Sequence, residues 1–152
     1  MNSFIRIAAT LLVFGGTAAA QDGKKSKAPE LELVREAKCT DVFGSPGAFD
    51  ASGVTLVKGK LYVVFDTRKS LGIVGTDLKK GQLSEGSPAY SDYEGVSYDT
   101  KRNCFYVVVE SMKGATGYNG ALVELDKDLK TTNRWILDPQ VGGPSKGLEG
   151  VV

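Results

Sequence analysis

Four carboxylates stand at the ends of short apolar runs, where a sheet could bring them together. Glu94 opens the run EGVSYD, and Glu110 closes the next run, CFYVVVE. In an antiparallel hairpin the start of the first strand lies beside the end of the second, about 5 Å away. Asp66 closes the run LYVVFD, and Glu149 lies in KGLEGVV. We expect all four carboxylates at the same end of neighbouring hairpins.

Carboxylates at such short range repel one another, and a hard divalent cation relieves the repulsion. Ca²⁺ is bound in proteins by oxygen ligands of this kind. The pattern therefore predicts a Ca²⁺ site formed by Asp66, Glu94, Glu110 and Glu149. The alternative is that backbone N–H groups or Lys and Arg side chains neutralise each carboxylate and hold neighbouring units in register.

Other catalytic patterns are weak. The sequence has no histidine, which removes the commonest general base and metal ligand. A Ser-His-Asp triad therefore cannot form within the chain. The segments GATGYNG and GGPSKG resemble phosphate loops, but neither is followed by a helix that begins with Lys-Ser or Lys-Thr. We interpret both as surface turns.

The carboxylates belong to a pattern that repeats along the chain. Gly53 matches Gly95 at a spacing of 42 residues, and Gly95 matches Gly150 at a spacing of 55. Tyr62 matches Tyr106 in the aliphatic run that follows. The additional residues fall in turns and loops, which tolerate insertion. The repeat therefore indicates one structural unit that occurs twice and begins a third time.

Each unit has the pattern of four strands. In the second unit these are residues 94–99, 104–110, 121–126 and 131–137. Four-stranded antiparallel meanders repeated at this spacing are typical of β-propeller blades. The runs FYVVVE and LYVVFD are apolar on both faces, as expected of strands that are covered on both sides. The predicted fold is all-β, with about two blades and the start of a third.

Two blades alone would expose apolar faces and open sheet edges. Propellers close into rings of about four to eight blades. We therefore expect the remaining blades from sequence beyond residue 152. Trp135, in the predicted outer strand, is expected to pack against the next blade, and ELELVREAKC at residues 30–39 is expected to form a further strand.

The segments YEGVSYDTKRNCFYVVVE, ALVELDKDLKTTNRWIL and KGLEGVV resemble the SdiA-regulated family of six-bladed propellers. They are similar also to esterase-like phytase and TolB-like propellers. The resemblance covers about residues 50–152, and it departs at Ser52, where the other copies have Glu94 and Glu149. It implies an extracytoplasmic propeller with acidic residues near the central channel, which in this group sometimes binds calcium.

The first 20 residues predict a signal peptide. Arg6 is the only charge, an apolar run follows, and Ala18-Ala19-Ala20 provides an A-x-A cleavage site. The apolar run is shorter than the roughly 20 residues of a membrane span, so we expect secretion without a stable membrane span. Residues 21–30 read as a polar linker, and residues 31–152 as a partial propeller domain.

The net charge of the mature chain argues against two classes of binding partner. Cleavage removes Arg6 from 19 basic residues and none of the 18 acidic ones, so the mature chain is neutral. A neutral chain is not suited to binding nucleic acid or anionic lipid.

Export would permit Cys39 and Cys104 to form a disulfide. The alternative is that Cys104 simply packs at the start of a strand.

Two functions fit these expectations. The first is a secreted scaffold that binds a small molecule or a protein, with Ca²⁺ at the acidic mouth of the channel. The second is a calcium-dependent hydrolase of the phytase, esterase or lactonase kind. In that case Glu94 and Glu110 would ligate the metal or act as a base near a metal-bound water. We favour the first.

Overall fold

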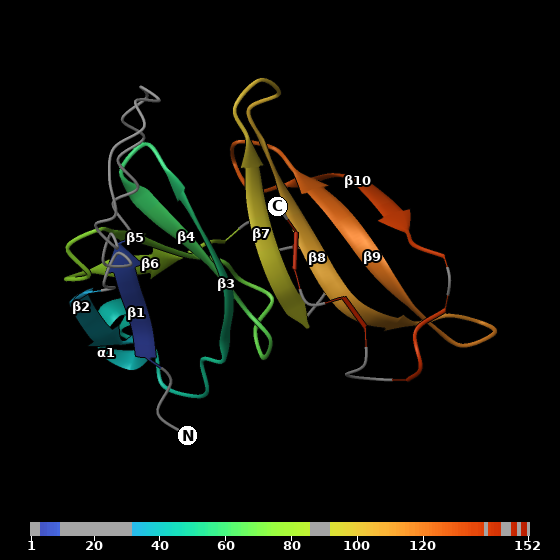
Figure 1. Ribbon diagram of the computed structural model, residues 1–152, viewed down its shortest axis with the longest axis horizontal. Helices are drawn as coiled ribbons and strands as arrows, with labels where there is room; N and C mark the ends of the chain where they lie inside the picture. The colour runs from blue at the N-terminus through green and yellow to red at the C-terminus, as the bar shows by residue number, and fades with distance from the viewer. Residues whose placement is uncertain are drawn as a thin grey trace, which may run out of the picture.

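The computed structural model describes residues 4–9, 32–85, 92–138, 140–143, 147–148 and 150–151. Over these ranges the chain is all-β apart from one short helix, and eight of its ten strands form two four-stranded antiparallel sheets (Figure 1). The predicted all-β class and the two four-stranded units are therefore confirmed.

The first sheet has the strand order β3-β4-β5-β6. Its strands are β3 (Ala51–Val57), β4 (Lys60–Phe65), β5 (Gly72–Gly75) and β6 (Gly81–Leu83). The turn between β3 and β4 consists of Lys58 and Gly59, which have φ values of 49° and 77°. Two consecutive residues with positive φ match the twist of the flanking strands, which keeps this hairpin tight.

The second sheet has the order β10-β9-β8-β7. Its strands are β7 (Tyr93–Asp99), β8 (Cys104–Lys113), β9 (Tyr118–Leu125) and β10 (Thr131–Ile136). Strands β8 and β9 are longer than the sequence indicates, because their pairing continues to Lys113 and Tyr118. The segment GATGYNG, which the sequence predicts to be a surface turn, therefore contains the start of β9, and the hairpin closes where the N–H of Gly114 donates to the carbonyl of Gly117 at 2.7 Å.

The first hairpins of the two sheets have the same register. Gly53 pairs with Val64, and Gly95 pairs with Val108. In each sheet the residue before the glycine is skipped by the pairing, which forms a β-bulge at the start of the strand. This agreement confirms the alignment of the two units that the sequence predicts.

The repeated glycines touch one another across units. A Cβ on Gly53 would lie 2.9 Å from the Cα of Gly95, and a Cβ on Gly95 would lie 2.9 Å from the Cα of Gly150. Only glycine permits backbones to approach this closely. Strands β3 and β7 consequently run side by side (Figure 1), and the segment around Gly150 meets β7 as β7 meets β3.

The first sheet is covered on both faces by apolar layers. The layer between the sheets contains Tyr62, whose ring lies 4.6 Å from the ring of Phe105. The other face is covered in part by helix α1 (Cys39–Phe43), whose Phe43 ring fits against Gly72 and Gly81. The buried members of this second layer are Cys39, Val42, Phe43, Phe49, Leu61, Val63, Phe65, Val74 and Leu78.

Before α1, strands β1 (Phe4–Ala9) and β2 (Glu32–Lys38) form a two-stranded antiparallel sheet. The strand expected in ELELVREAKC is therefore confirmed. Strand β1 falls within the predicted signal peptide, so cleavage there stays a prediction, and the predicted linker lies outside the described residues. The described part of the chain contains no helix that is long and apolar enough to cross a membrane.

The two cysteines form no disulfide with each other. Cys39 is fully buried in the layer that covers the first sheet, and Cys104 is buried at the start of β8, beside Tyr106. The packing alternative for Cys104 therefore describes this structure.

Candidate cation site

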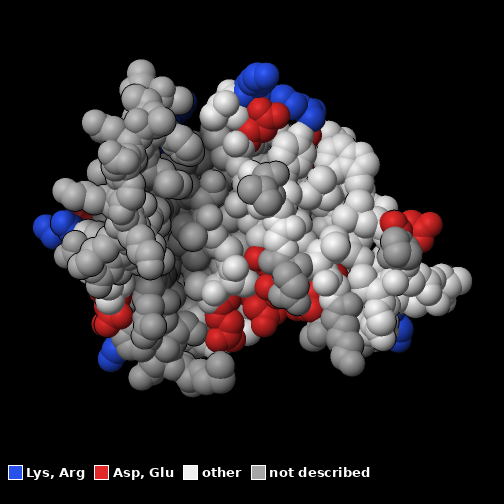
Figure 2. All heavy atoms as spheres, in the orientation of Figure 1, with Lys and Arg blue, Asp and Glu red and all other residues white. Residues whose placement is uncertain are grey.

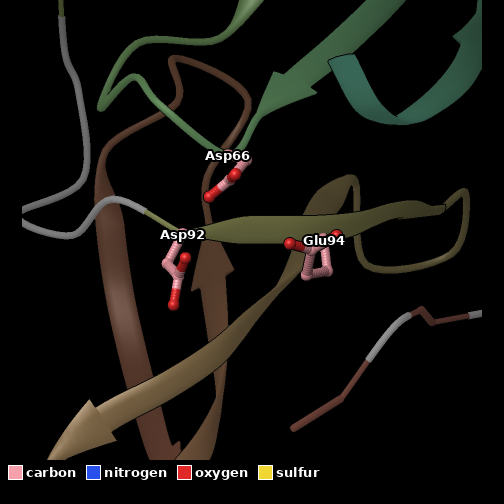
Figure 3. A group of neighbouring side chains, drawn as sticks. All are labelled: Asp66, Asp92 and Glu94. Carbon is pink, nitrogen blue, oxygen red and sulfur yellow. The ribbon is translucent and has the colours of Figure 1, made fainter. Parts of the chain in front are cut away.

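Three carboxylates meet where the two sheets adjoin. Asp66 follows β4, Asp92 precedes β7, and Glu94 is the second residue of β7 (Figure 3). One carboxylate oxygen from each residue lies within 4.8 Å of those of the other two, and all three residues are half-buried. Figure 2 shows a group of acidic side chains at this edge of the molecule, between the two sheets.

Backbone hydrogen bonds hold four acidic residues in a row at this edge. The N–H of Asp66 donates to the carbonyl of Asp50, and the N–H of Asp92 donates to the carbonyl of Asp66, each at 2.9 Å. The N–H of Glu110 donates to the carbonyl of Asp92, also at 2.9 Å. The row therefore passes from one sheet to the other without a break, and it fixes the spacing of the carboxylates.

The β-bulges determine what stands beside this row. Ser52 is the bulge residue of β3, and its hydroxyl donates to the carbonyl of Tyr93, which ties the two sheets together. Glu94 is the bulge residue of β7, and its carboxylate joins the site. A bulge redirects a side chain at a strand end. The same bulge position is therefore occupied by a serine that hydrogen-bonds to the other sheet in the first unit, and by a candidate metal ligand, Glu94, in the second.

The electrostatics of the site disfavour an additional negative charge. Burial raises the pKa of the Asp66 carboxyl above its ordinary value of 3.8, and the hydrogen bond and the charge of Asp92, with the charge of Asp50, raise it further. Repulsion of this kind is relieved by a shared proton or by a cation. The cluster can therefore attract a cation with carboxylate oxygens alone.

The structure unites part of the predicted set. Asp66 and Glu94 meet as expected, but the buried Glu110 joins the row only through its backbone N–H, and its carboxylate is not in the cluster. Its Oε1 accepts the N–H of Gly147 at 3.1 Å, which is the register-holding role considered as the alternative. Glu149 lies outside the described residues. Asp92 was not predicted because it precedes the apolar run.

A signal for Asp92 was nevertheless present in the sequence. Asp50 stands before the first unit at the same spacing from Gly53 as Asp92 has from Gly95. Extending the repeat by a few residues toward the N-terminus would have found both. Asp92 could therefore have been identified from the sequence, although its contact with Asp66 could not.

A second buried carboxylate belongs to the second sheet alone. Glu124 is 6% exposed. It accepts hydrogen bonds from Thr132 at 2.8 Å and from Asn133 and Tyr106 at 3.1 Å, and it lies 3.1 Å from Arg102. These contacts, the Thr132 bond foremost, lower the pKa of Glu124 although burial opposes them. This carboxylate is satisfied by its own sheet, so it stabilises the fold.

Comparison with known proteins supports the fold only. No family model matches the chain, and no curated protein matches it. A solved structure similar to it is the crystal structure of a member of the DUF4221 family from Bacteroides vulgatus, with a TM-score of 0.50 and 13% sequence identity. The match covers 72% of this chain and 41% of that chain. An SdiA-regulated assignment thus has no support from sequence families.

Proposed function

We propose that the two sheets are consecutive blades of a β-propeller and that this propeller is a secreted scaffold for a small-molecule or protein ligand. The repeated glycine contact supports the propeller. Gly53 meets Gly95, and Gly95 meets Gly150, and in both pairs a Cβ on the first glycine would lie 2.9 Å from the Cα of the second. A ring of blades requires such a recurring contact between innermost strands.

The exposed apolar side chains also support further blades. Val54 and Leu56 on β3 are 53% and 60% exposed, and Trp135 and Ile136 on β10 are 42% and 50% exposed. Large apolar residues gathered on the surface mark places that a partner covers. In the proposed ring, neighbouring blades cover them.

The acidic edge is the proposed Ca²⁺ site of this scaffold. The observation that carries it is the meeting of Asp66, Asp92 and Glu94, whose oxygens lie within 4.8 Å of one another. Ca²⁺ takes about six to eight oxygen ligands, so water would complete the shell around three carboxylates. The bound ion would join the end of one sheet to the start of the next, and its role would be to fix the angle between them.

Calcium titration of the metal-free chain by isothermal calorimetry tests this proposal. We expect one site with a dissociation constant of about 10⁻⁴ to 10⁻³ M, the range of extracellular Ca²⁺ modules. Asp92→Asn should weaken binding at least about tenfold, a change of about 1.4 kcal/mol. Asp128→Asn is the matched control, because Asp128 is an exposed aspartate paired with Lys127 outside the cluster.

The outcomes are distinct. No saturable heat, or equal affinity in the two variants, would reject the calcium site. Hydrolysis of a chromogenic ester or phosphate that depends on Ca²⁺ and is lost in Asp92→Asn would favour the hydrolase over the scaffold. Circular dichroism of each variant shows whether the fold is retained.

A further inference from the structure

A cavity with a different chemistry lies between the β3–β4 and β7–β8 turns. It has a volume of about 330 Å³ and is bounded by residues of both sheets. The acidic residues described above stand at the opposite ends of the same hairpins, because Asp50 and Asp92 precede the strands that lead to these turns. In Figure 2, basic side chains gather over the β7–β8 turn with acidic side chains next to them, and the larger acidic group lies at the opposite edge.

Three aromatic rings form the apolar wall of this cavity. Phe105 is 2% exposed, and its ring centroid lies 4.6 Å from that of Tyr62 and 4.8 Å from that of Tyr98. Both tyrosines are half-buried. The hydroxyl of Tyr98 donates to the side-chain oxygen of Asn103, which stands in the β7–β8 turn with a φ of 56°. Three strands, β4, β7 and β8, and a tight turn therefore hold the rings in place.

The polar rim of the cavity is basic. Lys58, Lys60 and Lys127 line it, and none of its lining residues is acidic. Lys127 is already paired with Asp128 at 2.6 Å, so Lys58 and Lys60 supply the positive charge. Exposed lysines beside a hairpin turn are ordinary on their own. Here they border a concave site with an aromatic wall, which is the combination that small-molecule sites show.

The combination of aromatic rings and lysines without acidic residues distinguishes this cavity from its neighbours, one of which, also about 330 Å³, is lined by Lys60 and Lys80 but by no aromatic ring. A neighbouring cavity of about 420 Å³ shares Tyr62 and Lys127 with it, but that cavity is also lined by Glu85 and Asp128. An anion therefore finds its favourable position between the two turns, where rings and ammonium groups are combined.

We propose that this cavity binds a small organic anion that carries a flat ring, such as an aryl phosphate or aryl carboxylate. The ring would lie against Tyr62, Tyr98 and Phe105, where offset or edge-on ring contacts are favourable. The anionic group would face Lys58 and Lys60. The volume of about 330 Å³ falls within the ordinary range for small ligands. This inference concerns a separate end of the molecule and does not depend on the calcium site.

The test compares phenyl phosphate with inorganic phosphate and phenol, which are the two halves of the probe. Binding to the 152-residue chain is measured by calorimetry. We expect phenyl phosphate to bind at least tenfold more tightly than either half. Equal affinity for phenyl phosphate and inorganic phosphate would mean that only charge matters, and equal affinity for phenyl phosphate and phenol would mean that only the rings matter. Either result overturns the proposal.

A pair of charge reversals locates the site. Lys60→Glu should lower the affinity for phenyl phosphate at least tenfold. Lys113→Glu makes the same change in net charge at the exposed end of β8, and it should alter affinity less than twofold. Equal losses in both variants would show a response to net charge and would overturn the assignment.

Amide chemical shifts of the unaltered chain give a readout that does not depend on variant folding. Phenyl phosphate should shift the amides of residues 58–62 and 98–105. Shifts confined to the acidic edge around Asp66 and Asp92 would overturn the proposal.

Discussion

The carboxyl of Asp66 is held where its negative charge is unfavourable. Burial is the first cause of its raised pKa, and Asp92 is the second. The folded chain therefore holds a proton at Asp66 more tightly than the unfolded chain does. By linkage, this residue reduces stability at neutral pH, and the reduction is relieved as the pH falls through the raised pKa toward 3.8.

Asp66→Asn tests this pH dependence in the metal-free chain. The free energy of unfolding of the unaltered chain, minus that of the variant, should increase as the pH falls from 7 toward 3.8, because only the unaltered chain takes up this proton. Urea unfolding at several pH values measures the difference. For Asp128→Asn the same difference in the free energy of unfolding should decrease as the pH falls, since the hydrogen bond to Lys127 lowers the pKa of Asp128. A difference that does not vary with pH would contradict the interpretation.

Glu124 behaves in the opposite way from Asp66. Its pKa lies below the ordinary 4.5, chiefly because Thr132 donates to it. Its contribution to stability is present above pH 4.5 and is lost as the pH falls through the lowered pKa. Glu124→Gln should destabilise the chain at pH 7 by about 1–3 kcal/mol, because buried donors would lose a charged acceptor.

Chemical denaturation at pH 7 checks this cost. Glu85→Gln is the control, because Glu85 is exposed and should change stability by no more than about 0.5 kcal/mol. Equal effects of the two substitutions would show that the network around Glu124 does not stabilise the sheet.

At the residue scale, sequence patterns identified carboxylates that end strands and missed those that depend on register. Asp66 and Glu94 could be predicted from the apolar runs that they border. Glu124 could not, because Arg102, Thr132 and Asn133 reach it from a turn and a neighbouring strand. Only the register of β8, β9 and β10 brings these groups together.

Among the elements, the first strands of the two units depend on their glycines. A Cβ at Gly53 would meet the backbone of Gly95 at 2.9 Å, with little room to relax. Gly53→Ala should therefore destabilise the chain by about 1–3 kcal/mol, the usual cost of overpacking. Thermal unfolding measures it. Gly142→Ala is the control, because a Cβ there would have no atom within 4 Å; a similar loss in both would refute the steric explanation.

The elements that could be predicted are those with a strong apolar alternation and clear turns. Strands β4 and β8 follow directly from LYVVF and CFYVVV. Helix α1 was missed because five residues carry too little periodicity. It ends where Gly44 adopts a left-handed φ of 61° and donates its N–H to the carbonyl of Thr40 at 3.0 Å. Tertiary packing of Phe43, rather than local propensity, supports so short a helix.

The whole molecule leaves large apolar side chains on its surface. Trp135 and Ile136 on β10 are the clearest case. We expect the isolated chain to self-associate as its concentration rises, because contact between such surfaces removes apolar area from water. Sedimentation velocity over a range of concentrations measures this. Ile136→Lys should weaken association several-fold, whereas Thr131→Lys, at an exposed polar position on the same strand, should not. A chain that stays monomeric throughout would contradict the expectation.

At this scale the repeat predicted the two four-stranded sheets, but not how they lie against each other. The sequence aligns Gly53, Gly95 and Gly150 without showing that they touch. The contact arises because β3 and β7 are both edge strands and pack along their length. The packing of the two sheets decides which of their edge strands adjoin, and no local sequence pattern predicts this.

The glycine contact also has a consequence for curvature. Where Gly53 meets Gly95, the backbones approach with no side chain between them, whereas farther from this edge Tyr62 and Phe105 stand between the sheets. Two sheets separated by unequal amounts along their width form a wedge. If every unit repeats the same wedge, its angle determines how many units complete a circle. A methyl group at the narrow side would open that angle, so the size of the closed assembly would be set at a position that bears no side chain.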